Sequence, residues 1–132
     1  MSLKLNLAAG ESLLIGRARV TNGGDKRCIL IVAGEERILR ESLLMLEKDA
    51  TTPARRICFV VQGIYLSDKS EELFPLYHET VRELVEVYPS LTMAVTDVSQ
   101  AILAGRYYDA LNQAHALVEM EARILEGVQR EA

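Results

Sequence analysis

The sequence predicts an α+β fold, in which a small antiparallel β-sheet of about five strands precedes a bundle of about four helices. In much of the first fifty residues, apolar and polar side chains alternate, as in a strand with one buried face. From Thr52 onward, apolar side chains recur every three or four positions, as along the buried face of a helix. We therefore divide the chain into a β-rich region, residues 1–50, and a helical region, residues 51–132.

Five segments of the β-rich region have the composition of strands. They cover residues 3–7, 11–15, 17–21, 28–33 and 37–41. The run Asn22-Gly23-Gly24-Asp25 predicts a hairpin turn between the third segment and the fourth. The fourth segment is apolar at every position, which predicts a strand covered on both faces. One of the two covers is either the helical region or a second subunit.

Four apolar stripes follow in the helical region. Thr52 and Pro53 predict the start of the first helix, because a threonine hydroxyl accepts a backbone N–H there and the proline ring suits the first helical position. Pro89 ends the second helix and Gly105 ends the third, and the short connections favour antiparallel neighbours. The stripes are Ile57, Val60, Val61 and Ile64; Leu73, Leu76, Tyr77, Val81, Leu84, Val85 and Tyr88; Leu91, Ala94, Val95, Val98 and Ile102; and Tyr107, Ala110, Leu111, Ala114, Leu117, Val118 and Leu125.

Charge is unevenly distributed along the 132 residues, whose net charge is −4. Residues 1–60 contain ten Lys and Arg against seven Asp and Glu, a balance of +3, and the remainder contains five against twelve, a balance of −7. A polyanion would therefore meet the N-terminal region and be repelled by the C-terminal one. The alternative is that both are ordinary solvated surfaces of opposite sign.

The sequence does not support several other kinds of chemistry. No window offers the roughly 18 consecutive apolar residues of a transmembrane helix, and the N-terminus lacks the apolar centre of a signal peptide, so we expect a cytoplasmic protein with no membrane partner. Cys28 and Cys58 lie in apolar runs and are expected to be buried and reduced. Together with His78 and His115 they lack the close spacings of a metal site, and we interpret the acidic pairs of the helical region as solvated. We expect no cofactor and no catalytic site.

The pair Arg55 and Arg56 falls in the first turn of the first predicted helix. Cations there oppose the helix dipole, at a cost of about 0.3 to 1 kcal/mol per charge, and an anionic partner such as a phosphate would offset that cost. No Trp, Tyr or Phe precedes Arg56, so RNA bases would have to stack on guanidinium groups. The candidate RNA-binding residues are Arg17, Arg19, Arg37, Arg40, Arg55 and Arg56, with Lys4, Lys26 and Arg27 as outer contacts.

Three residues of the last helix are candidates for binding a protein partner. Tyr107 and Tyr108 are consecutive and point about 100° apart on a helix, so they cannot both belong to the core and one is expected to face a partner. Glu121 lies beside the apolar stripe, where a carboxylate is expected to be partly buried and paired with Arg106, with Arg123 or with a partner chain.

Several stretches of the sequence match the pattern of a known family. They are residues 1–16, Ile38-Leu39-Arg40-Glu41, Thr51-Thr52-Pro53-Ala54-Arg55-Arg56, Ile64-Tyr65-Leu66, and the stretch from Tyr107-Tyr108 to Leu117-Val118-Glu119. Together they resemble the flagellum biosynthesis repressor family FlbT over nearly the whole chain. The resemblance implies a cytoplasmic bacterial regulator that binds the 5′ untranslated region of flagellin mRNA and lowers its translation and stability. It implies no enzymatic step, and it implies a small flagellar protein, FlaF, as a partner.

A second resemblance concerns the first forty residues. Gly10-Glu11-Ser12-Leu13-Leu14-Ile15-Gly16 together with Arg40-Glu41 is similar to the opening and closing strands of the carbon storage regulator family, whose members are small intertwined β dimers that bind mRNA leaders. The first-strand arginines of that family fall at about Leu7 and Ala8 here, so only the closing-strand arginine, Arg40, is retained. This resemblance implies a shared sheet and favours a homodimer.

Two hypotheses about function follow. In the first, the basic β-rich region and the pair Arg55 and Arg56 hold the leader of flagellin mRNA, and the helical region serves oligomerisation or docking of an accessory protein. In the second, the protein is an adaptor of flagellar assembly, whose helices bind flagellin or a FlaF-like partner, and any effect on mRNA is indirect. Phosphate contacts weaken steeply with salt, whereas apolar contacts do not, so salt dependence separates the two hypotheses.

Overall fold

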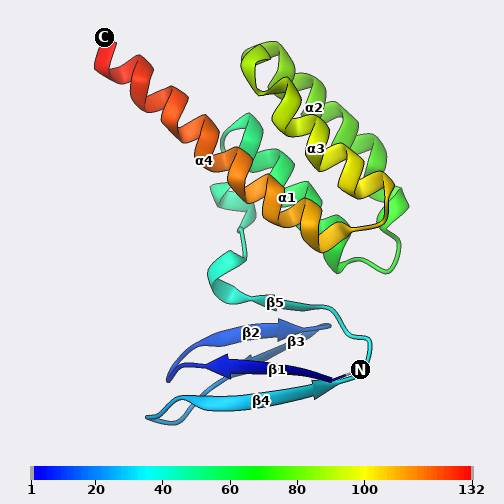
Figure 1. The fold of residues 1–132 in the computed structure, drawn as a ribbon, viewed down its shortest axis with the longest axis vertical. Coiled ribbons are helices and arrows are strands. Elements are labelled where there is room, and N and C mark those ends of the chain that lie inside the picture. Colours follow the sequence, from blue (N-terminus) through cyan, green and yellow to red (C-terminus); the bar gives the residue numbers. More distant parts are fainter. Residues whose placement is uncertain (1, 132) are drawn as a thin grey trace. The chain divides into compact units, whose positions relative to one another are not determined.

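The computed structural model describes the backbone of residues 2–131 and the side chains of residues 2–128. In the described residues, five β-strands come first and four α-helices follow, so the predicted α+β fold is confirmed. Figure 1 shows the strands and the helices as separate groups of elements. The chain forms two compact units, one that ends at Leu44 and one that begins at Met45. We refer to them as the strand unit and the helical unit.

The strand unit contains two small antiparallel sheets. The first sheet joins β1 (Ser2–Leu7) to β4 (Cys28–Ala33). In the second sheet, β2 (Ser12–Ile15) lies between β3 (Ala18–Thr21) and β5 (Ile38–Arg40). All five predicted segments are therefore strands. They form two sheets rather than one because β1 is hydrogen-bonded to β4 alone among the described strands.

The ribbon of β1 and β4 has one partly covered face and one bare face. The leucines of β1 lie opposite Cys28, Leu30 and Val32 of β4, and along this face burial increases towards Leu7, which is fully buried. The opposite face of β4 carries Ile29 and Ile31, whose exposed fractions are 56% and 72%. The prediction of a strand covered on both faces is therefore wrong for the single chain, because its odd-numbered side chains face solvent.

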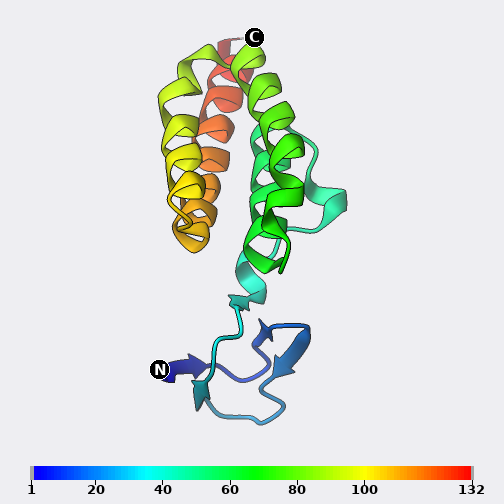
Figure 2. The same ribbon diagram turned by 90° about the vertical axis from the view of Figure 1, so that its right-hand side faces the viewer.

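The helical unit is built from four α-helices. They are α1 (Pro53–Leu66), α2 (Phe74–Val87), α3 (Thr92–Leu103) and α4 (Tyr107–Glu131). Helix α1 packs between α2 and α4, and α4 packs between α1 and α3 (Figures 1 and 2). A hydrogen bond of 2.7 Å between Tyr77 Oη and Ser99 Oγ joins α2 to α3. None of the described helices has both the length and the apolar character needed to cross a membrane.

The predicted apolar stripes form most of the bundle's core. The side chains that are at most 5% exposed include Ile57, Val61, Ile64, Tyr77, Leu84, Leu91, Val95, Val98, Ile102, Ala110, Leu111, Ala114 and Leu117. Two predicted members, Leu76 and Leu125, are exposed instead. Leu76 lies at the edge of the face that α2 buries, and Leu125 belongs to the last turns of α4, where no side chain between residues 122 and 128 is fully buried.

The two cysteines are predicted to differ in reactivity. The thiol of Cys58 is fully buried, and burial raises its pKa to about 12, whereas Cys28 is partly exposed. Because the thiolate is the reactive form, we expect one fast equivalent of labelling by a disulfide reagent in the native protein and a second only after denaturation. The substitution Cys28→Ser should abolish the fast equivalent. Equal labelling rates for both thiols in the native protein would contradict the burial of Cys58.

Candidate nucleic-acid interface

The six arginines predicted to bind RNA fall into two groups. The strand unit holds Arg17, Arg19, Arg37 and Arg40, and the first turn of α1 in the helical unit holds Arg55 and Arg56. Three of these side chains are exposed, namely those of Arg17, Arg19 and Arg55. The other three are half-buried, namely those of Arg37, Arg40 and Arg56. The surface available to a polyanion therefore differs from one arginine to the next.

The register of β2 places two arginines on opposite faces of the second sheet. Leu14 lies opposite Arg19 of β3, and the adjacent Leu13 lies opposite Arg40 of β5. Successive residues of a strand point to opposite faces, so Arg19 and Arg40 leave the sheet in opposite directions. Arg17 lies in the turn before β3. The sheet therefore does not gather Arg19 and Arg40 into one basic patch.

Arg19, Arg40 and Arg56 form ion pairs with glutamates. Arg19 contacts Glu41 at 2.6 Å, Arg40 contacts Glu11 at 3.0 Å, and Arg56 contacts Glu83. Each of these side chains is at least a third exposed, so each pair is expected to stabilise the fold by only about 0 to 1 kcal/mol. The pairs nevertheless cancel much of the local positive charge.

Arg17 and Arg55 are exposed arginines whose positive charge is not compensated by a nearby described acidic side chain. Among the described side chains, neither has a carboxylate oxygen within the 4.0 Å limit of an ion pair. The guanidinium of Arg55 makes a long hydrogen bond, 3.5 Å from Nη1 to the backbone oxygen of Asp49. Among the six candidates, these two are therefore the exposed guanidinium groups that need not give up an ion pair to bind a phosphate.

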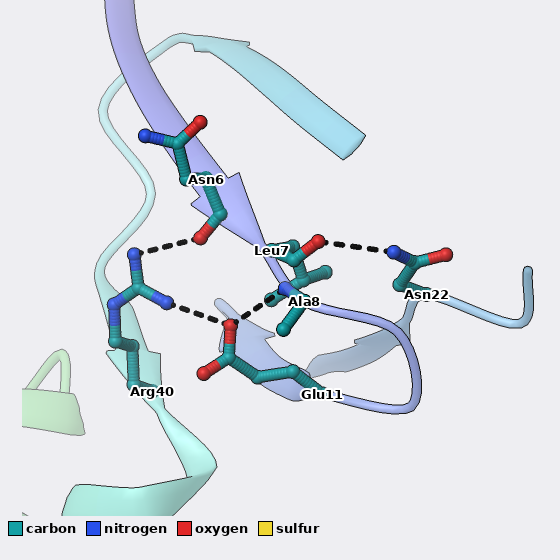
Figure 3. A network of polar contacts seen from close by, with 6 residues as sticks. All are labelled: Asn6, Leu7, Ala8, Glu11, Asn22 and Arg40. Carbon is teal, nitrogen blue, oxygen red and sulfur yellow. Dashed lines mark hydrogen bonds and ion pairs between the residues drawn. The ribbon is translucent and has the colours of Figure 1, made fainter. Parts of the chain in front are cut away.

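Arg40 is held inside a polar network of the strand unit. Its Nη1 donates to Glu11 Oε1 at 3.0 Å and its Nη2 donates to the backbone oxygen of Asn6 at 3.0 Å (Figure 3). The side chain of Asn22 binds the next carbonyl of β1, that of Leu7, at 3.0 Å. Arg40 thus ties β5 of the second sheet to β1 of the first. Its guanidinium is engaged in the fold to a greater extent than those of Arg17 and Arg19.

Helix α1 begins as the sequence predicts. Thr52 is its N-cap residue, and Thr52 Oγ1 accepts the backbone N–H of Arg55 at 3.2 Å. Pro53 occupies the first helical position and has no N–H to satisfy. The N–H of Arg56 donates to the carbonyl oxygen of Thr52 at 2.9 Å. Of the first four helical residues, only Ala54 then needs an acceptor from elsewhere.

Glu121 of α4 supplies that acceptor. The side chain is 1% exposed, and its carboxylate accepts hydrogen bonds from Thr52 Oγ1 and, at 2.9 Å, from the N–H of Ala54. The helix dipole favours an anion at this end, so Glu121 offsets the unfavourable placement of Arg55 and Arg56. The sequence had suggested a phosphate for this role. Because the N–H groups at the start of α1 are already satisfied, arginine side chains rather than the helix terminus would have to hold a phosphate.

The arginines that were predicted partners of Glu121 pair elsewhere. Arg106 contacts Asp109 at 3.7 Å, and Arg123 contacts Glu119 at 4.0 Å. Tyr88, at the end of α2, lies close enough to Glu121 that its pKa is raised, first by burial and then by the negative charge of that carboxylate. Glu121 is therefore engaged within the helical unit, and a role in binding a partner stays a prediction.

The two candidate tyrosines lie at the other end of the α1 and α4 pair. Tyr107 is half-buried, whereas Tyr108 is 44% exposed, and its ring centroid lies 5.4 Å from that of Tyr65. Tyr65 belongs to the last turn of α1 while Glu121 contacts its first turn, so α1 and α4 run antiparallel. Tyr108 is the member of the pair with the larger surface for a partner.

The acidic partners of the arginines were not identified from the sequence. Glu83 lies 27 positions from Arg56, and no local spacing connects the two. The described side chains contain no group of three or more His, Cys, Asp or Glu residues that could hold a metal ion. What the arrangement offers chemically is a set of exposed cations and a set of exposed apolar side chains.

The two compact units, one of strands and one of helices, define a small α+β protein with exposed arginines and exposed apolar side chains. The sequence comparison gives the family: the chain belongs to the FlbT family, since the family model described as "Flagellar protein FlbT" matches residues 3–125. The resemblance drawn from the sequence is thereby confirmed. No solved structure matches the chain.

Relatives of known name cover almost the whole chain. A protein of Rhodopseudomonas palustris (strain TIE-1), named probable flagellum biosynthesis repressor protein FlbT, is 33% identical over 125 residues, which make up 95% of this chain and 98% of the relative. A protein of Caulobacter vibrioides (strain ATCC 19089 / CIP 103742 / CB 15), named flagellum biosynthesis repressor protein FlbT, is 35% identical over 126 residues, or 92% of this chain and 87% of the relative.

Removing the charge of Glu121 should destabilise the helical unit. In Glu121→Gln the volume is kept, but the amide loses the negative charge and has only one oxygen for two donors, so we expect a loss of about 1 to 3 kcal/mol in the free energy of unfolding. The measurement is urea unfolding followed by helical circular dichroism. Glu119→Gln, at a side chain 74% exposed, is the matched control and should change stability by less than about 0.5 kcal/mol. Equal midpoints for the two variants would show that the buried contact contributes nothing.

Proposed function

We propose that this protein is a cytoplasmic, post-transcriptional repressor of flagellin synthesis, which binds the 5′ untranslated region of flagellin mRNA and lowers its translation and stability. Two relatives that cover nearly the whole chain are named as flagellum biosynthesis repressors, one of them as a probable one. The observation that carries the RNA-binding part is the exposure of Arg17 and Arg55 without a carboxylate partner among the described side chains.

In this proposal, the affinity for RNA comes from contacts between arginine side chains and the phosphates of the RNA backbone. Arg17 and Arg55 bind a phosphate without giving up an existing ion pair. Arg19 exchanges Glu41 for a phosphate at small cost, because the two side chains are 62% and 43% exposed and such pairs are weak. Arg40 contributes less, because its guanidinium also holds the backbone oxygen of Asn6. Each phosphate contact releases counterions, so binding should fall steeply with salt.

Base recognition in this proposal relies on guanidinium planes. The strand unit contains no Trp, Tyr or Phe on which an unpaired base can stack. Arginine side chains stack on bases and bind phosphates bidentately, so an exposed arginine can serve both purposes. This favours recognition of a single-stranded or looped leader in which bases are accessible.

A second candidate function is a protein-binding adaptor of flagellar assembly, with flagellin or a FlaF-like protein as its partner. The helical unit exposes large apolar side chains, of which Met93 at 83% and Leu103 at 82% are the most accessible. Val128, in the last turns of α4, is 59% exposed. Apolar contacts of this kind bind a protein surface and are nearly independent of salt.

A titration distinguishes the two functions. The protein is added to a labelled flagellin mRNA leader and to a scrambled leader of the same length, at low and at physiological salt. We expect tighter binding to the true leader, and for Arg17→Ala/Arg55→Ala an affinity loss of at least about tenfold with a salt slope smaller by about 2. The matched control, Arg82→Ala/Arg123→Ala, removes the same charge from exposed positions of the helical unit and should bind as the unchanged protein does.

Two outcomes would reject the RNA-binding proposal. Equal, weak binding to both leaders would show that no message is recognised, and normal binding by Arg17→Ala/Arg55→Ala would show that the site is elsewhere. Salt-insensitive binding of a FlaF-like protein or flagellin that is lost in Met93→Glu/Leu103→Glu would instead favour the adaptor.

A further inference from the structure

The outer edge of β4 is unusually apolar for an edge strand. β4 pairs with β1 on one side, and no described strand pairs with its other side (Figure 1). Its sequence, Cys-Ile-Leu-Ile-Val-Ala, contains neither a charge nor a proline. Natural edge strands are usually protected by lysines, prolines or bulges, because an unpaired row of N–H and C=O groups pairs with other chains. An unprotected edge is therefore expected to be covered in the working protein.

The bare face of the same ribbon adds to the apolar surface. Ile29 and Ile31 both project from this face and are 56% and 72% exposed. A ribbon of two strands is marginally stable in water, and three or more strands are normally needed. The edge of β4 therefore gains from additional strands.

We propose that β4 pairs antiparallel with β4 of a second copy of this chain, which creates a four-stranded sheet in the order β1, β4, β4, β1. This interface does not involve Arg17 or Arg55, although it includes Lys26 and Arg27, which the sequence suggested as outer RNA contacts. It is identified by the charges that flank the strand. Lys26 and Arg27 precede β4, and Glu35 and Glu36 follow it, and all four are exposed. In an antiparallel pair of identical strands the start of each lies against the end of the other, so the basic end of one copy meets the acidic end of its mate.

Symmetry and charge together select one register. A two-fold axis perpendicular to the sheet places the bare faces of both copies on the same side of the joined sheet. In such a pair, one residue of β4 must lie directly opposite the same residue of the second copy. With Ile31 on the axis, Ile29 lies opposite Ala33 of the second copy, and Arg27, just before the strand, lies near the bend after Ala33 that carries Glu35. The exposed charges brought near one another at each end of the interface are then of unlike sign.

The neighbouring registers bring like charges together. With Leu30 on the axis, the bend that carries Asp25 moves closer to the bend that carries Glu35 of the second copy. With Val32 on the axis, Arg27 moves past Glu35 towards Arg37 of the second copy. Like charges brought close across a strand pair are destabilising. The register centred on Ile31 is therefore the one proposed, and it joins the bare faces of the two ribbons into a single apolar surface.

Sedimentation tests the dimer. The unchanged protein should sediment as a dimer at micromolar concentration, and Ile31→Lys, which places a charge on the two-fold axis, should shift it to a monomer. Leu103→Lys is the matched control, because it makes the same kind of change at an apolar side chain that is 82% exposed on the helical unit. That variant should remain a dimer. A monomeric unchanged protein, or an Ile31→Lys variant that dimerises equally well, would overturn the proposal.

Disulfide trapping tests the register. In a Cys28→Ser background, Ile31→Cys should form a disulfide-linked dimer under mild oxidation, because directly opposed Cα atoms lie about 4.5 to 5.5 Å apart and a disulfide spans that distance. Ile29→Cys, on the same face of the same strand, should not, because the two counterparts are separated by four residues, or about 13 Å. Equal trapping at both positions, or none at Ile31→Cys, would refute this register.

Charge exchange provides an independent check that does not depend on the isoleucines. Arg27→Glu alone and Glu35→Arg alone should each weaken the dimer, by about tenfold or more in the dissociation constant, since each opposes like charges. The double variant Arg27→Glu/Glu35→Arg restores unlike pairs at both ends of the interface and should recover most of the affinity. If the double variant is as weak as the two single changes combined, these residues do not face each other.

Discussion

The bundle depends on one buried carboxylate, that of Glu121, at the start of α1. Its carboxylate accepts hydrogen bonds from Ala54 and Thr52, which lie 67 and 69 positions earlier in the chain. It also lies at the end of α1 where the helix dipole favours an anion. Because it is 1% exposed, it has little water to replace those bonds if α4 moves away. The contact therefore fixes how far α4 can slide along α1, and α4 in turn packs against α3. Packing of apolar stripes alone would leave that register less well defined.

The contact of Glu121 with the start of α1 also changes how Arg55 and Arg56 are interpreted. In the sequence, Arg55 and Arg56 appear as cations in need of an anion, and the structure supplies Glu121 for the helix terminus and Glu83 for Arg56. The chain's own acids thus compensate a good part of the positive balance of its first sixty residues. What remains for a polyanion is a small number of solvated guanidinium groups. Weak, exposed pairs such as that of Arg19 with Glu41 extend this set without a large cost.

Local patterns in the sequence were sufficient wherever the determining contacts are local. The bounds of β4, the N-cap at Thr52 and the inward stripe of α1 depend on neighbouring residues and were predicted. The partners of Glu121 and of Arg56 lie tens of positions away, so neither periodicity nor capping rules reveal them. The division of the strands into two sheets depends on which strands pair with one another. A run of apolar residues such as β4 does not show which of the two faces of the strand is buried within a single chain.

The two units meet the requirement for a core in different ways. The helical unit buries apolar residues from all four helices. Among the described apolar residues of the strand unit, which ends at Leu44, only Leu7, Leu13 and Leu39 are fully buried. At about this size, domains commonly need support beyond an apolar core. Here the polar network of Arg40, Glu11 and Asn22 joins the two sheets through backbone carbonyls. A substitution in that network should therefore weaken the strand unit as a whole, including positions of β1 that the substituted side chain never contacts.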